Sequence, residues 1–222
     1  MSVTEERVSM PLLNEPAPDF EAQSTHGPIK LSDYRGKYVV LFSHPGDFTP
    51  VCTTEIGGFA KYAEEFEKRN AQLIGLSVDS VPAHWAWIRD IERIFDVKIT
   101  FPLIADLDLK VSRLYGMIHP AASNTSTIRA VYIIDDKGIL RAVIYYPMSA
   151  GRNIPEILRV IDSLQTTDTT GYTTPADWQP GDPVIVPVTP TSGAIENEEE
   201  AKAKGLDYKS WYLRFKNDGR NS

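Results

Sequence analysis

Short apolar runs alternate with segments of helical periodicity along most of this 222-residue chain. Residues 38–43 and 73–78 are apolar runs of strand length, whereas residues 53–69 and 81–96 repeat apolar side chains at helical spacing. Such alternation is typical of a fold in which helices cover a largely buried sheet. The sequence therefore predicts an α/β fold.

The order of the elements expected after residue 100 makes the fold prediction more specific. A strand, a short helix, two strands around the turn sequence Asp135-Asp136-Lys137-Gly138 and a last helix are expected over residues 101–105, 109–115, 128–134, 139–145 and 154–164. Two strand-helix pairs followed by a hairpin and a helix form a thioredoxin-like order. Several α/β folds share that order, so the order alone does not identify the fold.

The composition changes near Gln165. A threonine-rich stretch and a series of prolines follow, and then come a charged helix candidate over residues 196–204 and a short strand candidate over residues 211–215. This tail is too small to bury its apolar side chains alone. We expect a thioredoxin-like core over residues 1–166 and a C-terminal extension arm over residues 167–222 that needs a partner surface.

Composition also excludes several classes of protein. The net charge of −7 argues against a broad nucleic-acid interface, which requires a basic face. No apolar run approaches the 18 residues of a membrane span, and residues 1–14 lack the apolar core of a signal peptide. A single cysteine excludes an intrachain disulfide and favours a reducing compartment, so we expect a cytoplasmic protein.

That cysteine, Cys52, follows a loop rich in Pro, Gly and Thr that leaves an apolar run and opens a helix. Thr49 is a plausible N-cap with Pro50 at the first helical position. Cys52 then lies in the first turn, where free N–H groups and the helix dipole favour an anion such as a thiolate. A lone cysteine is usually a small buried hydrophobe, but this context favours a reactive one.

Pro45-x-x-x-Thr49-x-x-Cys52 resembles the active-site motif of the peroxiredoxins. The resemblance continues in the same order through most of the chain, over residues 16–20, 31–37, 75–80, 84–87 and 127–135. His44 before the proline and the long C-terminal extension are similar to the one-cysteine subgroup with archaeal relatives. The resemblance implies a thioredoxin-like peroxidase domain with a C-terminal dimerisation arm.

The resemblance also implies an activity. The chain is expected to reduce hydrogen peroxide and organic hydroperoxides to water and alcohols through a sulfenic acid on Cys52, in antioxidant defence. An external thiol would recycle the sulfenic acid, because the chain has no second cysteine. Thr49 would bond sulfur and peroxide, Arg129 would stabilise the thiolate and hold the peroxide, and Pro45 would shield the thiolate from water.

Three further residues are assigned by the same resemblance. His44 would bind the substrate or adjust the electrostatics, and Glu55 and Arg152 would form an ion network that orients Arg129. Structural alternatives stay open: Thr49 as a helix cap only, Arg129 in a buried ion pair, and His44 as part of the turn. The other histidines lack metal-ligand spacing, so neither a metal nor a cofactor is expected.

The expected partners are a hydroperoxide, an external thiol and a second copy of the chain in a homodimer, with assembly into a decameric ring left open. No nucleic acid or membrane is expected. Two other functions remain as alternatives: an oligomeric redox-sensing chaperone, and a cysteine hydrolase using Cys52 with a histidine. The preferred peroxide and the reductant are not readable from the sequence.

Overall fold

The computed structural model of the chain describes residues 10–189 and 198–217. The chain divides into two compact units, Met1–Ile154 and Pro155–Ser222. The predicted domain boundary between residues 166 and 167 lies inside helix α5 (Ile154–Thr170), and the predicted domain division stays a prediction. No helix among the described residues has the length and apolar character needed to cross a membrane.

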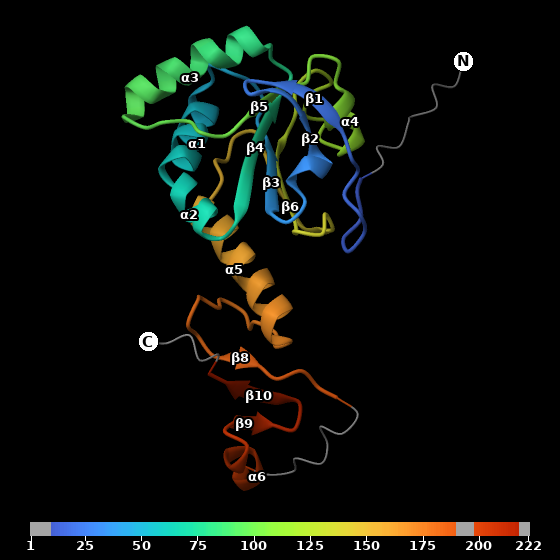
Figure 1. Cartoon of the computed structure of the whole chain (residues 1–222), viewed down its shortest axis with the longest axis vertical. Coiled ribbons are helices and arrows are strands. Elements are labelled where there is room, and N and C mark those ends of the chain that lie inside the picture. Colours follow the sequence, from blue (N-terminus) through green and yellow to red (C-terminus); the bar gives the residue numbers. More distant parts are fainter. Residues whose placement is uncertain (1–9, 190–197, 218–222) are drawn as a thin grey trace, which may run out of the picture. The chain divides into compact units, whose positions relative to one another are not determined.

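The first unit is built on a seven-stranded sheet in the order β2-β1-β5-β4-β3-β6-β7 (Figure 1). In the centre, β3 pairs in parallel with β4 and antiparallel with β6, while β4 is parallel to β5. The strands are β1 Glu21–Ser24, β2 Gly27–Lys30, β3 Tyr38–Ser43, β4 Ala71–Ser77, β5 Leu103–Ala105, β6 Arg129–Ile134 and β7 Leu140–Tyr146. The predicted strands all occur; the hairpin of β1 and β2 was not predicted, because its segments are short and largely polar.

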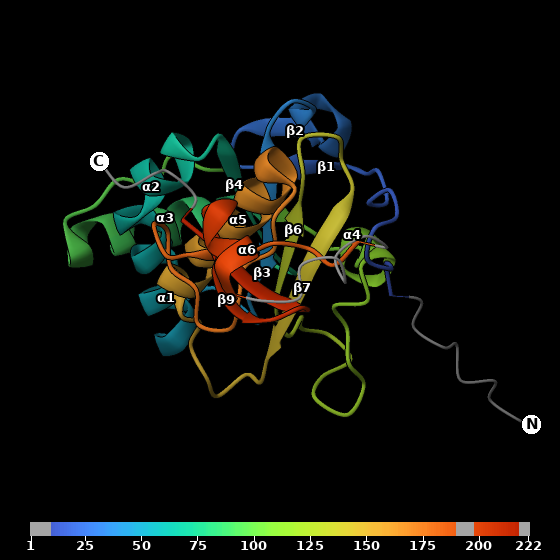
Figure 2. The ribbon, with the colours of Figure 1, turned by 90° about the horizontal axis from the view of Figure 1, so that it is seen from below.

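Helices lie on both sides of this sheet. In two views at right angles, α1 and α3 lie on one side and α4 on the other (Figures 1 and 2). The helices of this unit are the 3₁₀ helix η1 Leu31–Tyr34 and the α-helices α1 Pro50–Lys61, α2 Ala63–Lys68, α3 Val81–Phe95 and α4 Lys110–Leu114. This mixed sheet with covering helices confirms the predicted α/β class.

The helix predicted over residues 53–69 is two helices in the structure, α1 and α2, and its start also differs. The apolar periodicity places the start of the helix too late, whereas the capping residues place it correctly: the helix begins at Pro50, directly after the N-cap position Thr49. It is also interrupted at Tyr62, whose backbone has φ −99° and ψ 5°. The Tyr62 N–H is shared between the carbonyls of Gly58 and Phe59, both at 3.2 Å, so the regular hydrogen-bond ladder ends there and α2 starts anew.

The alternation of β6 decides where Arg129 points. Ala130 and Tyr132 belong to the hydrophobic core on one face of the sheet. Neighbouring residues of a strand face opposite sides, so Arg129 faces the other side. On that side Phe42 of β3 stacks on Phe59 of α1, with ring centroids 4.1 Å apart. Arg129 therefore shares its face of the sheet with α1, the helix that carries Cys52.

The second unit holds α5, α6 (Glu198–Ala203) and a three-stranded antiparallel sheet in the order β8-β10-β9. Its strands are β8 Val184–Ile185, β9 Asp207–Ser210 and β10 Leu213–Lys216. The strand predicted over residues 211–215 is displaced, because Trp211 and Tyr212 form the turn between β9 and β10. Residues 196 and 197 of the predicted charged helix lie outside the described residues.

Helix α5 is six residues longer at its C-terminal end than the segment predicted over residues 154–164. The added residues run into the threonine-rich stretch, for which the sequence analysis predicts no helix. Their hydroxyls bond to carbonyls one turn back, as Thr170 Oγ1 does to Thr166 O at 2.6 Å. This local satisfaction of the hydroxyl groups lets a threonine-rich segment stay helical.

Gly75 in β4 provides a test of the packing around Phe42, on the face of the sheet that α1 covers. A Cβ atom there would lie 2.5 Å from Leu103 Cδ2 and 3.2 Å from the Phe42 ring. We expect Gly75→Ala to lower the free energy of unfolding by about 1–3 kcal/mol through overpacking, measured by urea denaturation. Gly151→Ala is the matched control, because its Cβ would have only an ordinary 3.5 Å contact, and equal losses in both variants would contradict the packing argument.

Candidate active site

Cys52 lies in the first turn of α1, as the sequence predicts. Thr49 is the N-cap with extended backbone angles (φ −100°, ψ 146°), and Pro50 follows at the first helical position. The hydroxyl of Thr49 does not cap the helix, so the N–H groups of the first turn keep their capacity to donate. The Cys52 side chain has no exposed surface. Its sulfur is nevertheless not surrounded by hydrocarbon alone.

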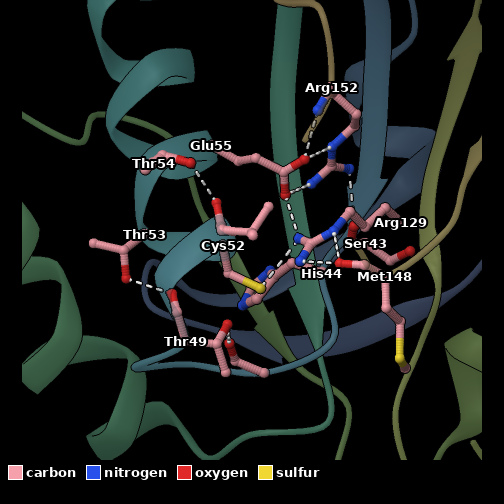
Figure 3. A network of polar contacts seen from close by, with 12 residues as sticks. Ser43, His44, Thr49, Cys52, Thr53, Thr54, Glu55, Arg129, Met148 and Arg152 are labelled. Atoms are coloured by element: carbon pink, nitrogen blue, oxygen red, sulfur yellow. Dashed lines mark hydrogen bonds and ion pairs between the residues drawn. The ribbon is translucent and has the colours of Figure 1, made fainter. Parts of the chain in front are cut away.

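Arg129, at the start of β6, contacts this sulfur directly. Its Nη1 lies 3.2 Å from Cys52 Sγ, and the side chain is only 3% exposed (Figure 3). Nε and Nη2 of the same guanidinium donate to the carbonyl of Met148 at 3.0 and 2.8 Å. The sulfur receives a hydrogen bond from no other side chain among the described residues. The guanidinium is thus fixed at the sulfur by a backbone oxygen.

Glu55, one turn along α1 from Cys52, joins Arg129 to Arg152. Its Oε2 accepts from Arg129 Nη1 at 2.6 Å and from Arg152 Nη2 at 2.7 Å. Its Oε1 accepts from both the backbone N and the Nε of Arg152, each at 2.9 Å. The Arg152 guanidinium also lies over the rings of Phe42 and Phe59, at 5.2 and 5.5 Å from the ring centroids. The predicted ion network is therefore present in the structure.

The charges of this buried cluster do not cancel. Two guanidinium groups and one carboxylate leave one positive charge, and burying an unpaired charge is costly. Burial acts to raise the pKa of Glu55, but the hydrogen bonds and charge of Arg152, with the charge of Arg129, outweigh it and hold that pKa below its ordinary value of 4.5. Glu55 is therefore a carboxylate, and a thiolate on Cys52 would make the cluster neutral.

The remaining predicted residues lie on the loop between β3 and α1. The Thr49 hydroxyl donates to the carbonyl of Gly46 at 2.9 Å, and Pro45 is half-buried. The His44 side chain is fully buried and its Nε2 lies 2.9 Å from Asp47 Oδ1. None of these three side chains has a hydrogen bond to the sulfur in the described part of the chain. The structure thus brings Arg129, Glu55 and Arg152 into one network with Cys52, and places Pro45, Thr49 and His44 on the adjoining loop.

Sequence reasoning missed Met148, Asp47 and His84. Met148 acts through its carbonyl, which every residue has, so no side-chain signal could have found it. Asp47 stands inside the quoted motif, and its three-residue spacing from His44 was a usable signal. His84, whose Nδ1 lies 2.7 Å from Asp47 Oδ2, is 37 residues away in the sequence, and no local pattern links the two residues.

One group of side chains has potential metal ligands close together. Ligand atoms of His44, Asp47 and Asp79 lie within 4.8 Å of one another. These groups hydrogen-bond within the protein: His44 with the Asp47 side chain, and the Asp47 backbone N with Asp79 Oδ2 at 3.0 Å. We assign no metal to them, and the absence of a metal centre stays a prediction.

Comparison with known proteins bears on the meaning of this geometry. Residues 13–143 match the AhpC/TSA family, and residues 163–201 match the C-terminal domain of 1-Cys peroxiredoxin. A curated relative named Peroxiredoxin 2, from Caldanaerobacter subterraneus subsp. tengcongensis, is 55% identical over 95% of each chain. The chain belongs to the peroxiredoxin family. A peroxiredoxin of Aquifex aeolicus is also similar, 54% identical over 94% of this chain and 97% of the relative.

Solved peroxiredoxin structures agree with the fold. A yeast mitochondrial 1-Cys peroxiredoxin has a TM-score of 0.82 and 44% identity, covering 94% of this chain and all of that one. A mutant of peroxiredoxin 6 from Arenicola marina has a TM-score of 0.84 and 40% identity, covering 95% of this chain and all of that one. These neighbours confirm the predicted thioredoxin-like fold, the one-cysteine subgroup and the thiol-dependent peroxidase class.

The Glu55 carboxylate makes the stability of this peroxiredoxin depend on acid. Because its pKa is lowered in the folded state, its stabilisation is complete above the unfolded-state pKa near 4.5 and is lost as the pH falls through the folded value. We expect Glu55→Gln to lower the free energy of unfolding at pH 7 by about 3 kcal/mol, with a smaller difference from wild type at pH 3. Urea denaturation between pH 3 and 7 measures both effects.

Glu65→Gln is the matched control, because Glu65 forms surface pairs with Lys68 and Arg69. Exposed pairs contribute little, so this variant should follow the wild-type curve closely. A Glu55→Gln variant with the wild-type pH dependence would show that the buried network does not bind Glu55 as a carboxylate.

Proposed function

We propose that this thiol peroxidase acts through the thiolate of Cys52, which attacks one oxygen of a hydroperoxide. A sulfur–oxygen bond forms as the oxygen–oxygen bond breaks, and the bonding electron pair leaves with the second oxygen. That oxygen takes a proton from solvent and departs as water or an alcohol, so Cys52 is left as a sulfenic acid. The observation that carries the proposal is the 3.2 Å contact of Arg129 Nη1 with the sulfur inside a cluster that lacks one negative charge.

Arg129 is proposed both to stabilise the thiolate and to bind the peroxide. Four of its five N–H groups are accounted for by Cys52 Sγ, Glu55 and the Met148 carbonyl, which leaves one N–H on Nη2. This N–H and the free N–H groups at the start of α1 can donate to the leaving oxygen as its charge grows. Fixed donors of this kind are usually the largest contribution to catalysis.

Thr49 is proposed to accept a hydrogen bond from the peroxide. Its own hydroxyl hydrogen is used in the 2.9 Å bond to the Gly46 carbonyl, so the lone pairs of Oγ1 are left for the substrate. Pro45 is proposed to shield the sulfur from bulk water, because it follows His44 directly in this loop and carries no N–H. His44 is proposed to bind the substrate.

Glu55 and Arg152 are proposed as residues that position Arg129. Glu55 fixes Nη1, the same nitrogen that contacts the sulfur. Arg152 in turn bonds to both Glu55 oxygens and donates from Nη1 to the carbonyls of Ser43 and Ala130, at 2.8 and 3.1 Å. Two neighbouring strands therefore hold Arg152 in place. The Arg129 guanidinium, which Glu55 and the Met148 carbonyl already hold in place, loses little conformational entropy when it binds the substrate.

The sulfenic acid is proposed to be reduced by a thiol from outside the chain, because Cys52 is its only cysteine. The work on the similar yeast protein concerns thiol resolution via glutathione and thioredoxin systems. We propose a reductant of one of these two kinds here, in the cytoplasm. The alternatives of a cysteine hydrolase and a chaperone are not favoured by the family comparison.

The second unit is proposed to be the dimerisation arm. Its hairpin between β9 and β10 presents Trp211 and Tyr212, which are 51% and 56% exposed and contact each other edge to face. Large exposed aromatic side chains are typical of surfaces that bind another protein. We propose a homodimer, and leave its assembly into a ring to experiment.

The chemistry is tested by replacing the sulfur. We expect Cys52→Ser to reduce hydroperoxide consumption to the uncatalysed rate while leaving the far-UV circular dichroism unchanged, because the exchange is nearly isosteric. In the wild type, one equivalent of hydrogen peroxide with dimedone should give one adduct on Cys52 by intact-protein mass. Peroxide consumption by Cys52→Ser, or a wild-type protein without the adduct, would contradict the proposal.

The arm is tested by changing the hairpin turn. Trp211→Ser with Tyr212→Ser should weaken association by at least tenfold, because each aromatic side chain buries about 150–250 Å² when covered. Light scattering after size exclusion at a series of concentrations measures this. Leu107→Ser, at an exposed position of the first unit, is the control and should keep the wild-type mass. An unchanged mass in the double variant would remove the turn from the interface.

A further inference from the structure

The carboxylate of Asp47 binds two histidines. Its Oδ1 lies 2.9 Å from His44 Nε2, and its Oδ2 lies 2.7 Å from His84 Nδ1. The side chains of all three residues are at most 1% exposed. Asp47 belongs to the loop that carries Pro45 and Thr49, whereas His84 belongs to α3. This one carboxylate therefore joins the active-site loop to a second helix.

His84 has two hydrogen-bond partners. Its Nε2 lies 3.1 Å from the carbonyl of Ile104, which can only accept a hydrogen bond. Burial acts to raise the pKa of Asp47, but the hydrogen bonds and charges of His44 and His84 outweigh it and hold that pKa below its ordinary value of 3.8. Asp47 is thus a carboxylate that also only accepts. Both partners of His84 therefore offer acceptors only.

His44 is arranged differently. Its Nε2 donates to Asp47, and burial lowers its pKa more than Asp47 raises it, so the ring is neutral. Nδ1 then carries a lone pair and no hydrogen. This atom is buried and has no hydrogen-bond partner among the described residues. Buried polar atoms are nearly always paired, so an unpaired acceptor in an active-site loop indicates a ligand that donates.

The neighbouring ionisable groups do not supply that donor. Asp79 accepts from the Asp47 backbone N and from Ser77 Oγ, at 3.0 and 2.7 Å. Arg152 donates to Glu55 and to backbone carbonyls. Figure 3 draws His44 in the same group of side chains as Cys52 and Arg129. A peroxide bound at the sulfur is therefore the ligand best placed to pair Nδ1.

We propose that His44 Nδ1 accepts a hydrogen bond from the peroxide, and that Asp47 and His84 are positioning residues that keep this nitrogen an acceptor. The inference rests on the peroxidase mechanism proposed above. His44 Nδ1 and Thr49 Oγ1 then give the site two hydrogen-bond acceptors for the substrate. It distinguishes substrates by the number of hydrogens they carry.

Hydrogen peroxide has a hydrogen on each oxygen, whereas an alkyl hydroperoxide has one on the terminal oxygen only. Both hydrogens of hydrogen peroxide can be paired in this site, but an alkyl hydroperoxide leaves one acceptor unpaired. A site built to bond a substrate hydroxyl discriminates against the analogue that lacks it, because its own polar atom is left without a partner. The arrangement therefore favours hydrogen peroxide over alkyl hydroperoxides.

The test measures the second-order rate of Cys52 oxidation by hydrogen peroxide and by tert-butyl hydroperoxide, from intact-protein mass in single turnover. His44→Phe removes the acceptor, and Asp47→Leu removes the group that orients it. In both variants, the rate with hydrogen peroxide divided by the rate with tert-butyl hydroperoxide should fall by about tenfold, as expected for the loss of one hydrogen bond. A merely structural disturbance lowers both rates equally and leaves the ratio unchanged.

Asp47→Asn is the rescuing variant. The amide oxygen can still accept from His44 Nε2, and the amide N–H can donate to His84 Nδ1 while His84 Nε2 still donates to Ile104, so the ratio should stay near the wild-type value. His119→Phe, a histidine on the loop after α4, controls for the loss of an imidazole. Unchanged ratios in both His44→Phe and Asp47→Leu would overturn the inference while leaving the peroxidase intact. Oxidation of wild-type Cys52 by neither peroxide would overturn the proposed mechanism itself.

The hydrogen positions can be checked without any variant. Long-range proton–nitrogen spectra of the protein labelled with ¹⁵N-histidine, at pH 7, should show His44 with hydrogen on Nε2 only. A hydrogen on His44 Nδ1 would overturn the inference, because that nitrogen would then donate and could not accept from the peroxide.

Discussion

The two oxygens of Glu55 bind two guanidinium groups, and the rest of the site depends on this contact. Arg152, fixed by backbone carbonyls and by the rings of Phe42 and Phe59, fixes Glu55, and Glu55 fixes the nitrogen of Arg129 that meets the sulfur. This cluster has one positive charge left over, which a thiolate on Cys52 would neutralise. Helix α1, the central strands and the nucleophile are thereby coupled through charge as well as through packing.

The same loop and helix give the site two different kinds of hydrogen-bonding group. Arg129 and the start of α1 provide donors that suit growing negative charge on oxygen. Thr49 has its own hydrogen engaged, and His44 is held in one tautomer by Asp47, so both are left as acceptors. Donors and acceptors together in one small site specify the orientation of a substrate as well as its identity.

The sequence predicted the parts of this arrangement that depend on side-chain type and local spacing. The α/β class and the strands of the sheet core follow from periodicity. The start of the helix after Thr49, with Cys52 in the first turn, follows from the residue types there, although the Thr49 hydroxyl makes no capping hydrogen bond. The proximity of Arg129 to Cys52 was implied by the family motif. The break at Tyr62, the helical threonines after Gln165 and the turn at Trp211 were not predictable in this way. They depend on how backbone hydrogen bonds are shared in the folded chain.

Met148 has a consequence for how this site can vary. Its carbonyl receives two hydrogen bonds from Arg129, so the residue contributes through its backbone and not through its thioether. Almost any residue at position 148 could provide this carbonyl, so the identity of its side chain is only weakly constrained by the site. The length of the segment between β7 and α5 is constrained instead, since one inserted or deleted residue would move the carbonyl and turn the guanidinium away from the sulfur.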